Sequence, residues 1–192
     1  SLIDLKTLKE AWHYDRADAA SLLATAFGVV VFGVEAGILS GVALSLGMLV
    51  WRSSHPHIAV VGRVPGTEHF RNVERHAVQT VAGLLAVRPD ESLYFANATV
   101  LEARIEALIA KGPAVRRVLL VCSAINQIDT TALGVLTELE RSLAARGIDF
   151  MFAEVKGPVM DRLRPTELGR RLQGRVFLSV HEAFEQASLA HS

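Results

Sequence analysis

The chain has 192 residues, enough for one domain and an appendage, with 20 basic and 20 acidic side chains and zero net charge. Without a basic excess we expect no nucleic-acid partner. The single cysteine, Cys122, excludes an internal disulfide and a multi-cysteine zinc site. Because Cys122 lies in an apolar run, we expect a buried and inert thiol. The mean hydropathy of +0.32 is high for a water-soluble protein.

Residues 1–18 are predicted to form an amphipathic segment on a membrane surface. Apolar side chains recur there at helical spacing, and three basic side chains accompany them: Leu2, Leu5, Leu8 and Trp12, with Lys6, Lys9 and Arg16. Such a segment is typical of a helix that lies in the headgroup layer rather than crossing it.

Residues 19–51 contain one ionisable side chain, Glu35. As one straight helix this run would be roughly 50 Å long, well beyond a hydrocarbon core of about 30 Å. Glycines flank Glu35 on both sides, so we predict two short helices, Ala19–Phe32 and Ala36–Trp51. They would form a transmembrane hairpin over residues 19–52. The alternative is a buried core hairpin of a soluble protein.

The position of Glu35 leaves two interpretations open. An ionisable residue within a membrane often binds an ion. Because Glu35 falls at the expected turn, a solvated loop carboxylate is the simpler interpretation. Basic residues flank both outer ends of the hairpin, so we expect both ends to be cytoplasmic.

Small residues recur every fourth position through the hairpin, at Gly33, Gly37, Gly41 and Ser45. The last three share one face of the second predicted helix. Small side chains at this spacing let membrane helices approach closely, which matters because lipid provides no hydrophobic drive for helix association. We therefore predict that these four are helix-packing positions.

Residues 53–76 are predicted to be a linker with one short strand, which a Pro65–Gly66 turn closes. His55 and His57 would share a strand face and could bind a metal. No cysteine or carboxylate cluster lies beside them, so we predict no metal site.

From residue 77 onward, short apolar runs alternate with amphipathic helices. The predicted strands are 83–87, 117–122, 148–155 and 175–179, and helices are expected from a cap at Asn97 or Thr99 to Gly112, from Asp129 to Gly147, from Gly157, and over 181–190. Strands that alternate with helices imply a mostly parallel sheet with helices on its faces. We therefore expect residues 77–192 to form an α/β domain.

The segment Val118–Gly134, a strand, a loop and a helix start, is the best candidate site, because ligands of open α/β sheets collect at the carboxyl ends of strands. Asp129 is placed to cap the helix, and Thr130 and Thr131 put hydroxyls at the same end. A phosphoryl group there would add about −1.5 to −2 charge. The alternative, which we favour, is a capping turn whose hydroxyls only satisfy the backbone.

The sequence contains no recognisable catalytic arrangement: it lacks a nucleophile elbow, a Walker A loop and a dinucleotide-binding glycine motif. We therefore predict neither an enzyme nor a cofactor. Five arginines could form a basic patch that faces anionic lipid, or they could lie on a solvated helix surface, which the interrupting Asp161 and Glu167 favour: Arg162, Arg164, Arg170, Arg171 and Arg175.

Three segments of the sequence resemble the end of SulP-family anion transporters. The hairpin is followed by RSSHPHIAVVGRVPGT over 52–67 and RPDESLYFAN over 88–97, and both segments are specific to these transporters. The segment LVCSAINQIDTTA over 120–132 resembles their cytoplasmic STAS domain.

The resemblance implies a secondary transporter of sulfate, bicarbonate or dicarboxylate-like anions that works as a homodimer in the inner (plasma) membrane. The hairpin would be the last two helices of the gate domain, and residues 77–192 would be a cytoplasmic STAS domain for regulation and dimerisation. The substrate site would lie in helices upstream of Ser1. The expected partners are membrane lipid, those upstream helices, a second copy and a cytoplasmic regulatory protein.

The alternative function is a STAS partner-switch regulator, similar to anti-sigma-factor antagonists, with a phosphorylatable threonine. The resemblance aligns the phosphorylated hydroxyl of those proteins with Thr131, where they usually have serine, and Ala132 replaces their usual glycine. Both departures favour a scaffold role over a phosphorylation switch. The apolar run over 19–51 discriminates between the two functions, because a soluble switch has no use for it.

Overall fold

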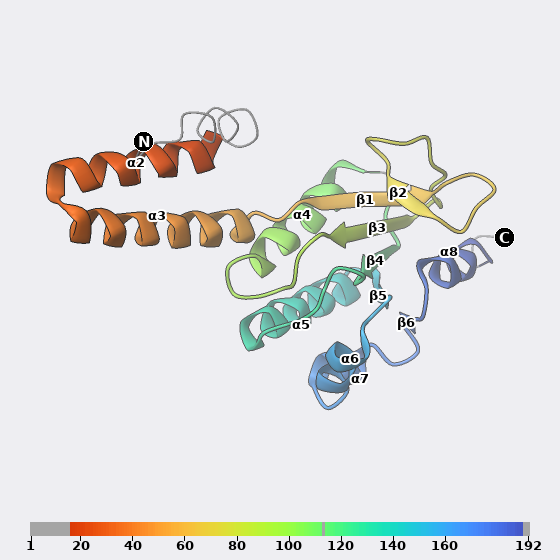
Figure 1. The fold of residues 1–192 in the computed structure, drawn as a ribbon. Helices are drawn as coiled ribbons and strands as arrows, with labels where there is room; N and C mark the ends of the chain where they lie inside the picture. The colour runs from red at the N-terminus through yellow and green to blue at the C-terminus, as the bar shows by residue number, and fades with distance from the viewer. Residues whose placement is uncertain (1–15, 113, 190–192) are drawn as a thin grey trace. The chain divides into compact units, whose positions relative to one another are not determined.

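The computed structural model describes residues 16–112 and 114–189 (Figure 1). Contacts within the chain divide it into two compact units, residues 1–53 and 54–192. The amphipathic segment predicted over residues 1–18 lies outside the described residues, apart from its last three positions.

The first unit is a pair of helices, α2 (Arg16–Phe32) and α3 (Val34–Ser54). Gly33 joins them with φ +86°, a left-handed conformation that glycine adopts without steric cost. The chain therefore turns at one residue, and the expectation of a turn across 33–37 is wrong. Glu35 lies in the first turn of α3, where the positive helix end favours a carboxylate, and not in a loop.

Large apolar side chains cover the outside of both helices. Phe32, Leu39 and Trp51 are 70%, 71% and 65% exposed. By length and composition Val34–Ser54 could cross a membrane, whereas the apolar part of α2, Leu23–Phe32, is shorter. Only 11% of the apolar window in α3 is buried, which disfavours the alternative of a soluble core hairpin.

The second unit contains a six-stranded sheet in the order β2-β1-β3-β4-β5-β6. The strands are β1 (Ile58–Arg63), β2 (Phe70–Asn72), β3 (Leu84–Pro89), β4 (Arg117–Val121), β5 (Asp149–Ala153) and β6 (Val176–Phe177). β3 to β6 run parallel, and β1 pairs antiparallel with both β2 and β3. The prediction of a mostly parallel sheet is confirmed.

Helices cover both faces of this sheet. They are α4 (Ala98–Lys111), α5 (Thr130–Ala145), α6 (Gly157–Leu163), α7 (Glu167–Arg171) and α8 (Val180–Leu189). Side chains of α4 to α7 pack on one face, against residues such as Leu120 and Phe150. α8 packs on the other, against residues such as Leu119 and Met151. Neighbouring residues of a strand thus enter opposite cores, as the period of two requires.

The structure also contains elements that the sequence analysis did not anticipate. Segment 53–76, expected as a linker with one short strand, contributes that strand as β1, and it adds the unpredicted β2 to the sheet. β2 and α7 have three and five residues, too few to show a periodic apolar pattern. The strand predicted over 175–179 is reduced to Val176–Phe177.

Candidate functional site

Asp129 holds together two loops at the end of the sheet. One oxygen of its carboxylate, Oδ1, accepts from the backbone N–H of Ala132 at 2.7 Å, which is the predicted cap of α5. The other, Oδ2, accepts from the N–H of Phe95 at 2.9 Å. Leu93 adds two backbone hydrogen bonds, donating to Gln127 at 3.0 Å and accepting from Asp129 at 3.1 Å. The β3–α4 and β4–α5 loops are therefore one connected surface.

Thr130 and Thr131 occupy the first turn of α5, and both are exposed. In the part of the chain that the structure describes, neither hydroxyl makes a side-chain hydrogen bond. A phosphoryl group would thus meet solvent and the positive end of α5. A regulatory role for this loop is still a prediction.

Asn97 differs from its expected role as a helix cap. It stands directly before α4, but its side chain makes no capping hydrogen bond. Instead Oδ1 accepts from the N–H of Tyr94 at 3.0 Å, and Nδ2 donates to the carbonyl of Ser92 at 2.9 Å. Asn97 is fully buried, so it holds the 92–97 loop from inside and leaves Phe95 66% exposed beside Asp129.

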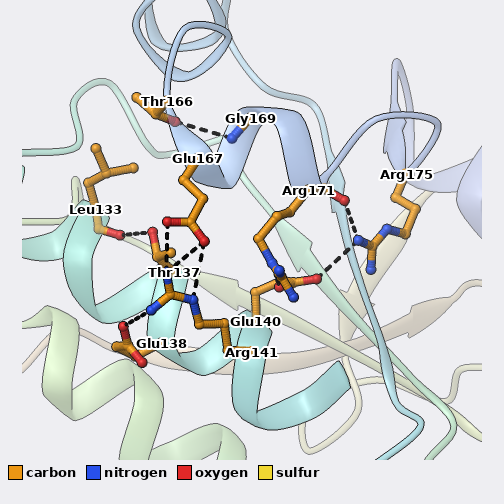
Figure 2. Close-up of polar contacts among 10 residues, drawn as sticks. All are labelled: Leu133, Thr137, Glu138, Glu140, Arg141, Thr166, Glu167, Gly169, Arg171 and Arg175. Atoms are coloured by element: carbon orange, nitrogen blue, oxygen red, sulfur yellow. Dashed lines mark hydrogen bonds and ion pairs between the residues drawn. The ribbon is translucent and has the colours of Figure 1, made fainter. Parts of the chain in front are cut away.

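A buried carboxylate, Glu140, lies on α5 facing α7 (Figure 2). Glu140 is 1% exposed, pairs with Arg171, and accepts from Arg175 at 3.0 Å. On the solvent side, Arg141 contacts Glu167 at 2.6 Å. Sequence reasoning missed Glu140, because nothing local marks a helix glutamate that will meet arginines more than 30 positions away.

This network divides the run of five arginines. Arg171 and Arg175 face Glu140, Arg164 lies 3.7 Å from Asp161, and Arg170 donates to the carbonyl of Pro165. A basic patch made of all five arginines therefore does not form. Arg162 lines a pocket of about 150 Å³ beside the β4–α5 loop.

In segment 53–76, His57 contacts a carboxylate. His57 Nδ1 lies 2.8 Å from Asp90 Oδ2, and Arg88 Nε donates to the other oxygen at 3.0 Å. Partial burial opposes ionisation of Asp90, but the hydrogen bonds from His57 and Arg88 lower its pKa overall. Within residues 16–112 and 114–189 no group of three or more side chains is arranged to hold a metal.

The four predicted helix-packing positions have different surroundings. Gly37 and Gly41 are buried where α3 approaches α2. A Cβ on Gly37 would lie 2.2 Å from a methyl of Val29, and one on Gly41 would lie 2.8 Å from Thr25. Gly33 forms the turn, and Ser45 is exposed.

Cys122 is buried at the end of β4. Desolvation and, to a smaller extent, the negative charge of Glu154 raise the pKa of its thiol. Because the thiolate is the reactive form, we expect maleimide to leave Cys122 unmodified from about pH 7 to about pH 9 and to modify it in concentrated urea. Mass spectrometry of the labelled chain checks this, and rapid labelling of the folded protein would contradict it.

Replacing Asp129 with alanine is expected to destabilise the second unit by about 1–2 kcal/mol, because the helix cap and the acceptor for Phe95 are both lost. Asp129→Asn should cost less, since asparagine also caps helices well. The control is Asp161→Ala, which removes only a 3.7 Å exposed ion pair. Urea unfolding followed by circular dichroism measures the differences; equal losses for Asp129→Ala and Asp161→Ala would contradict the prediction.

Comparison with known proteins gives one family and several relatives. The STAS domain profile matches residues 75–183. Probable sulfate transporter 4.2 of Arabidopsis thaliana is 31% identical over 196 residues, which cover 96% of this chain and 29% of that protein. The chain spans about 30% of the length of the curated relatives it matches.

Two solved structures share the fold. The murine solute carrier 26 family member A9 anion transporter, in its inward-facing state, matches 94% of this chain and 30% of its own length, with a TM-score of 0.84 and 19% identity. A putative anti-sigma factor antagonist from Thermotoga maritima matches 57% of this chain and 91% of its own, with a TM-score of 0.50 and 24% identity. Because the profile covers more than half of the sequence and the sheet has the predicted mostly parallel form, the chain belongs to the STAS-domain family.

Proposed function

We propose that this chain is the C-terminal part of a secondary anion transporter of the sulfate-permease type. Residues 19–52 would be the last two membrane helices, within the gate domain. Residues 77–192 would be a cytoplasmic STAS domain that regulates transport and holds two copies together. The substrate site would lie in membrane helices outside this chain.

The observation that carries this proposal is that one chain contains both an apolar hairpin and a STAS domain, and that it aligns with a sulfate transporter over nearly its whole length. Sulfate transporter 4.2 aligns with 96% of the chain, so the likeness includes the hairpin as well as the domain. The hairpin exposes large apolar side chains such as Phe32, Leu39 and Trp51, and exposure of so much apolar surface to water is unfavourable. Lipid or neighbouring membrane helices would cover them.

The membrane topology follows from charge. Arg52 lies in the last turn of α3, and Arg63 ends β1. Basic residues next to a membrane helix favour the cytoplasmic side. The proposed location is therefore the inner (plasma) membrane of the cell, with the STAS domain in the cytoplasm.

The partner-switch alternative makes a different use of the exposed Thr130 and Thr131. That function needs a water-soluble domain that a kinase and a binding partner can approach. The hairpin gives no support to it, and the match to an anti-sigma factor antagonist covers only 57% of the chain.

Two measurements test the proposal. The complete reading frame that contains this chain is expected to restore sulfate uptake, measured with radioactive sulfate, to cells that lack their own sulfate transporters. The same protein should stay in the membrane pellet after alkaline carbonate extraction, which releases peripheral proteins. Recovery of the protein in the soluble fraction, or absence of uptake of any of the expected anions by a membrane-inserted protein, would overturn the proposal.

A further inference from the structure

A small pocket lies where the parallel strands β4 and β5 end. Its volume is about 150 Å³, and its lining comes from the β4–α5 loop, α5 and α6: Asn126, Gln127, Ile128, Leu133, Pro158, Val159, Arg162 and Leu163. The carboxyl-end edge is where open α/β sheets bind their ligands. The proposed function assigns no role to these residues.

The walls of the pocket are fixed. Lys156 Nζ donates to Asn126 Oδ1 at 2.5 Å, which joins the β5–α6 loop to the β4–α5 loop. The N–H of Asn126 donates to Ser92 Oγ at 3.1 Å, which ties the same loop to the β3–α4 loop. Val159 and Leu163 anchor α6 in the core. A partner would therefore spend little free energy on ordering the site.

The pocket combines an apolar floor with a positive rim. Ile128 and Leu133 line it, and both pack against the core cluster. Among residues 16–112 and 114–189, exposed Arg162 has neither a hydrogen-bond nor an ion-pair partner. The side chain of exposed Lys156 contacts, within the described part of the chain, only the neutral amide of Asn126. By contrast with Arg162, the nearby Arg164 lies beside Asp161.

The size of the pocket limits what it can hold. Small-molecule and cofactor sites have volumes of about 300–1,000 Å³, so a pocket of about 150 Å³ fits one bulky side chain better than a cofactor. An anionic lipid surface is typically bound by about 4–8 clustered basic residues, whereas this rim has two. Those two cations beside an apolar recess complement a short peptide that carries carboxylates next to one apolar side chain.

We propose that this pocket docks an acidic segment of a partner protein. One leucine or phenylalanine of the segment enters the recess between Leu133 and Leu163. Neighbouring aspartate or glutamate carboxylates contact Arg162 and Lys156. The site is separate from the hydroxyls of Thr130 and Thr131 and needs no phosphorylation.

The test uses the whole chain in phosphatidylcholine nanodiscs, with isotope-labelled leucine methyl groups observed by NMR. The probes are three synthetic peptides: one leucine among glutamates, the same peptide with alanine in place of leucine, and one leucine among lysines. Only the first is expected to shift the methyl signals of Leu133 and Leu163. Arg162→Glu should weaken its binding about tenfold and let the lysine peptide bind instead. The matched control, Arg164→Glu, should change binding by less than about twofold.

The proposal is overturned if the acidic and lysine peptides bind the unsubstituted chain equally, or if no peptide shifts these signals at millimolar concentration. It is also overturned if Arg162→Glu and Arg164→Glu have the same effect. Shifts caused by phosphatidylglycerol vesicles, without any from the acidic peptide, would assign the pocket to a lipid surface and refute a protein partner. The reversed peptide preference of Arg162→Glu also shows that the variant is folded.

Discussion

Glu140→Ala is expected to destabilise the second unit by about 3 kcal/mol. The substitution leaves the half-buried Arg171 and Arg175 without the buried carboxylate that they share (Figure 2). Breaking a buried pair costs about 3–5 kcal/mol, and the low end applies because the two arginine side chains are 36% and 27% exposed. Glu140→Gln keeps the shape and one acceptor, so we expect roughly half the loss.

The matched control is Glu138→Ala on the same helix. Glu138 is exposed and contacts only the exposed Arg141 among the described residues, so its loss should cost less than about 1 kcal/mol. Both tryptophans of the sequence, at 12 and 51, belong to the first unit, so tryptophan fluorescence would not follow this unfolding. Urea unfolding by circular dichroism and hydrogen exchange of α7 and β6 are the suitable measurements. Similar losses from Glu138→Ala and Glu140→Ala would refute a structural role for the buried network.

Gly37→Leu is expected to separate α2 from α3, at a cost of about 2–3 kcal/mol. A Cβ at Gly37 would lie 2.6 Å from Cα of Val29 and 2.7 Å from its backbone nitrogen. Backbone atoms cannot rotate out of the way, so the two helices must move apart. If the hairpin belongs to a transport gate, the full transporter should also lose most of its uptake while its amount in the membrane stays unchanged.

Gly47→Leu is the matched control, because a Cβ at Gly47 would meet no atom of another described element within 4 Å. Spin labels on Phe27→Cys and Leu39→Cys, both exposed positions, report the distance between the helices. Buried Cys122 should stay unlabelled. We expect the distance distribution to lengthen and broaden with Gly37→Leu and to be unchanged with Gly47→Leu. An unchanged distribution in both variants would show that the glycine contact does not hold the hairpin.

Features that depend on nearby residues could be predicted from the sequence. The apolar run over 19–51 predicts the helix pair, because a long segment with a single ionisable side chain and a glycine break is a local property of the sequence. Asp129 directly before the pattern of α5 predicts a cap, because capping joins groups only three positions apart. The alternation of strands and helices after residue 77 predicts the parallel sheet for the same reason.

Features that join distant residues could not be predicted. The short strand predicted in segment 53–76 is β1, but the sequence did not indicate that β1 pairs with β3 and with β2 and so extends the sheet. Asn97 has the position of a cap, but the fold of the 92–97 loop turns its amide inward. Likewise, the pocket at Arg162 is formed by the β4–α5 loop, α5 and α6, which the fold brings together from distant parts of the sequence.

The sequence by itself determined the two kinds of unit, the apolar hairpin and the α/β domain, because periodicity and hydropathy are local properties. Only the tertiary structure decided which charges are paired, as for Glu140 with Arg171 and Arg175, and which line a pocket without an ion-pair partner among the described residues, as for Arg162. The physical reason is that an ion pair depends on distance in space, which a linear pattern of residues does not contain.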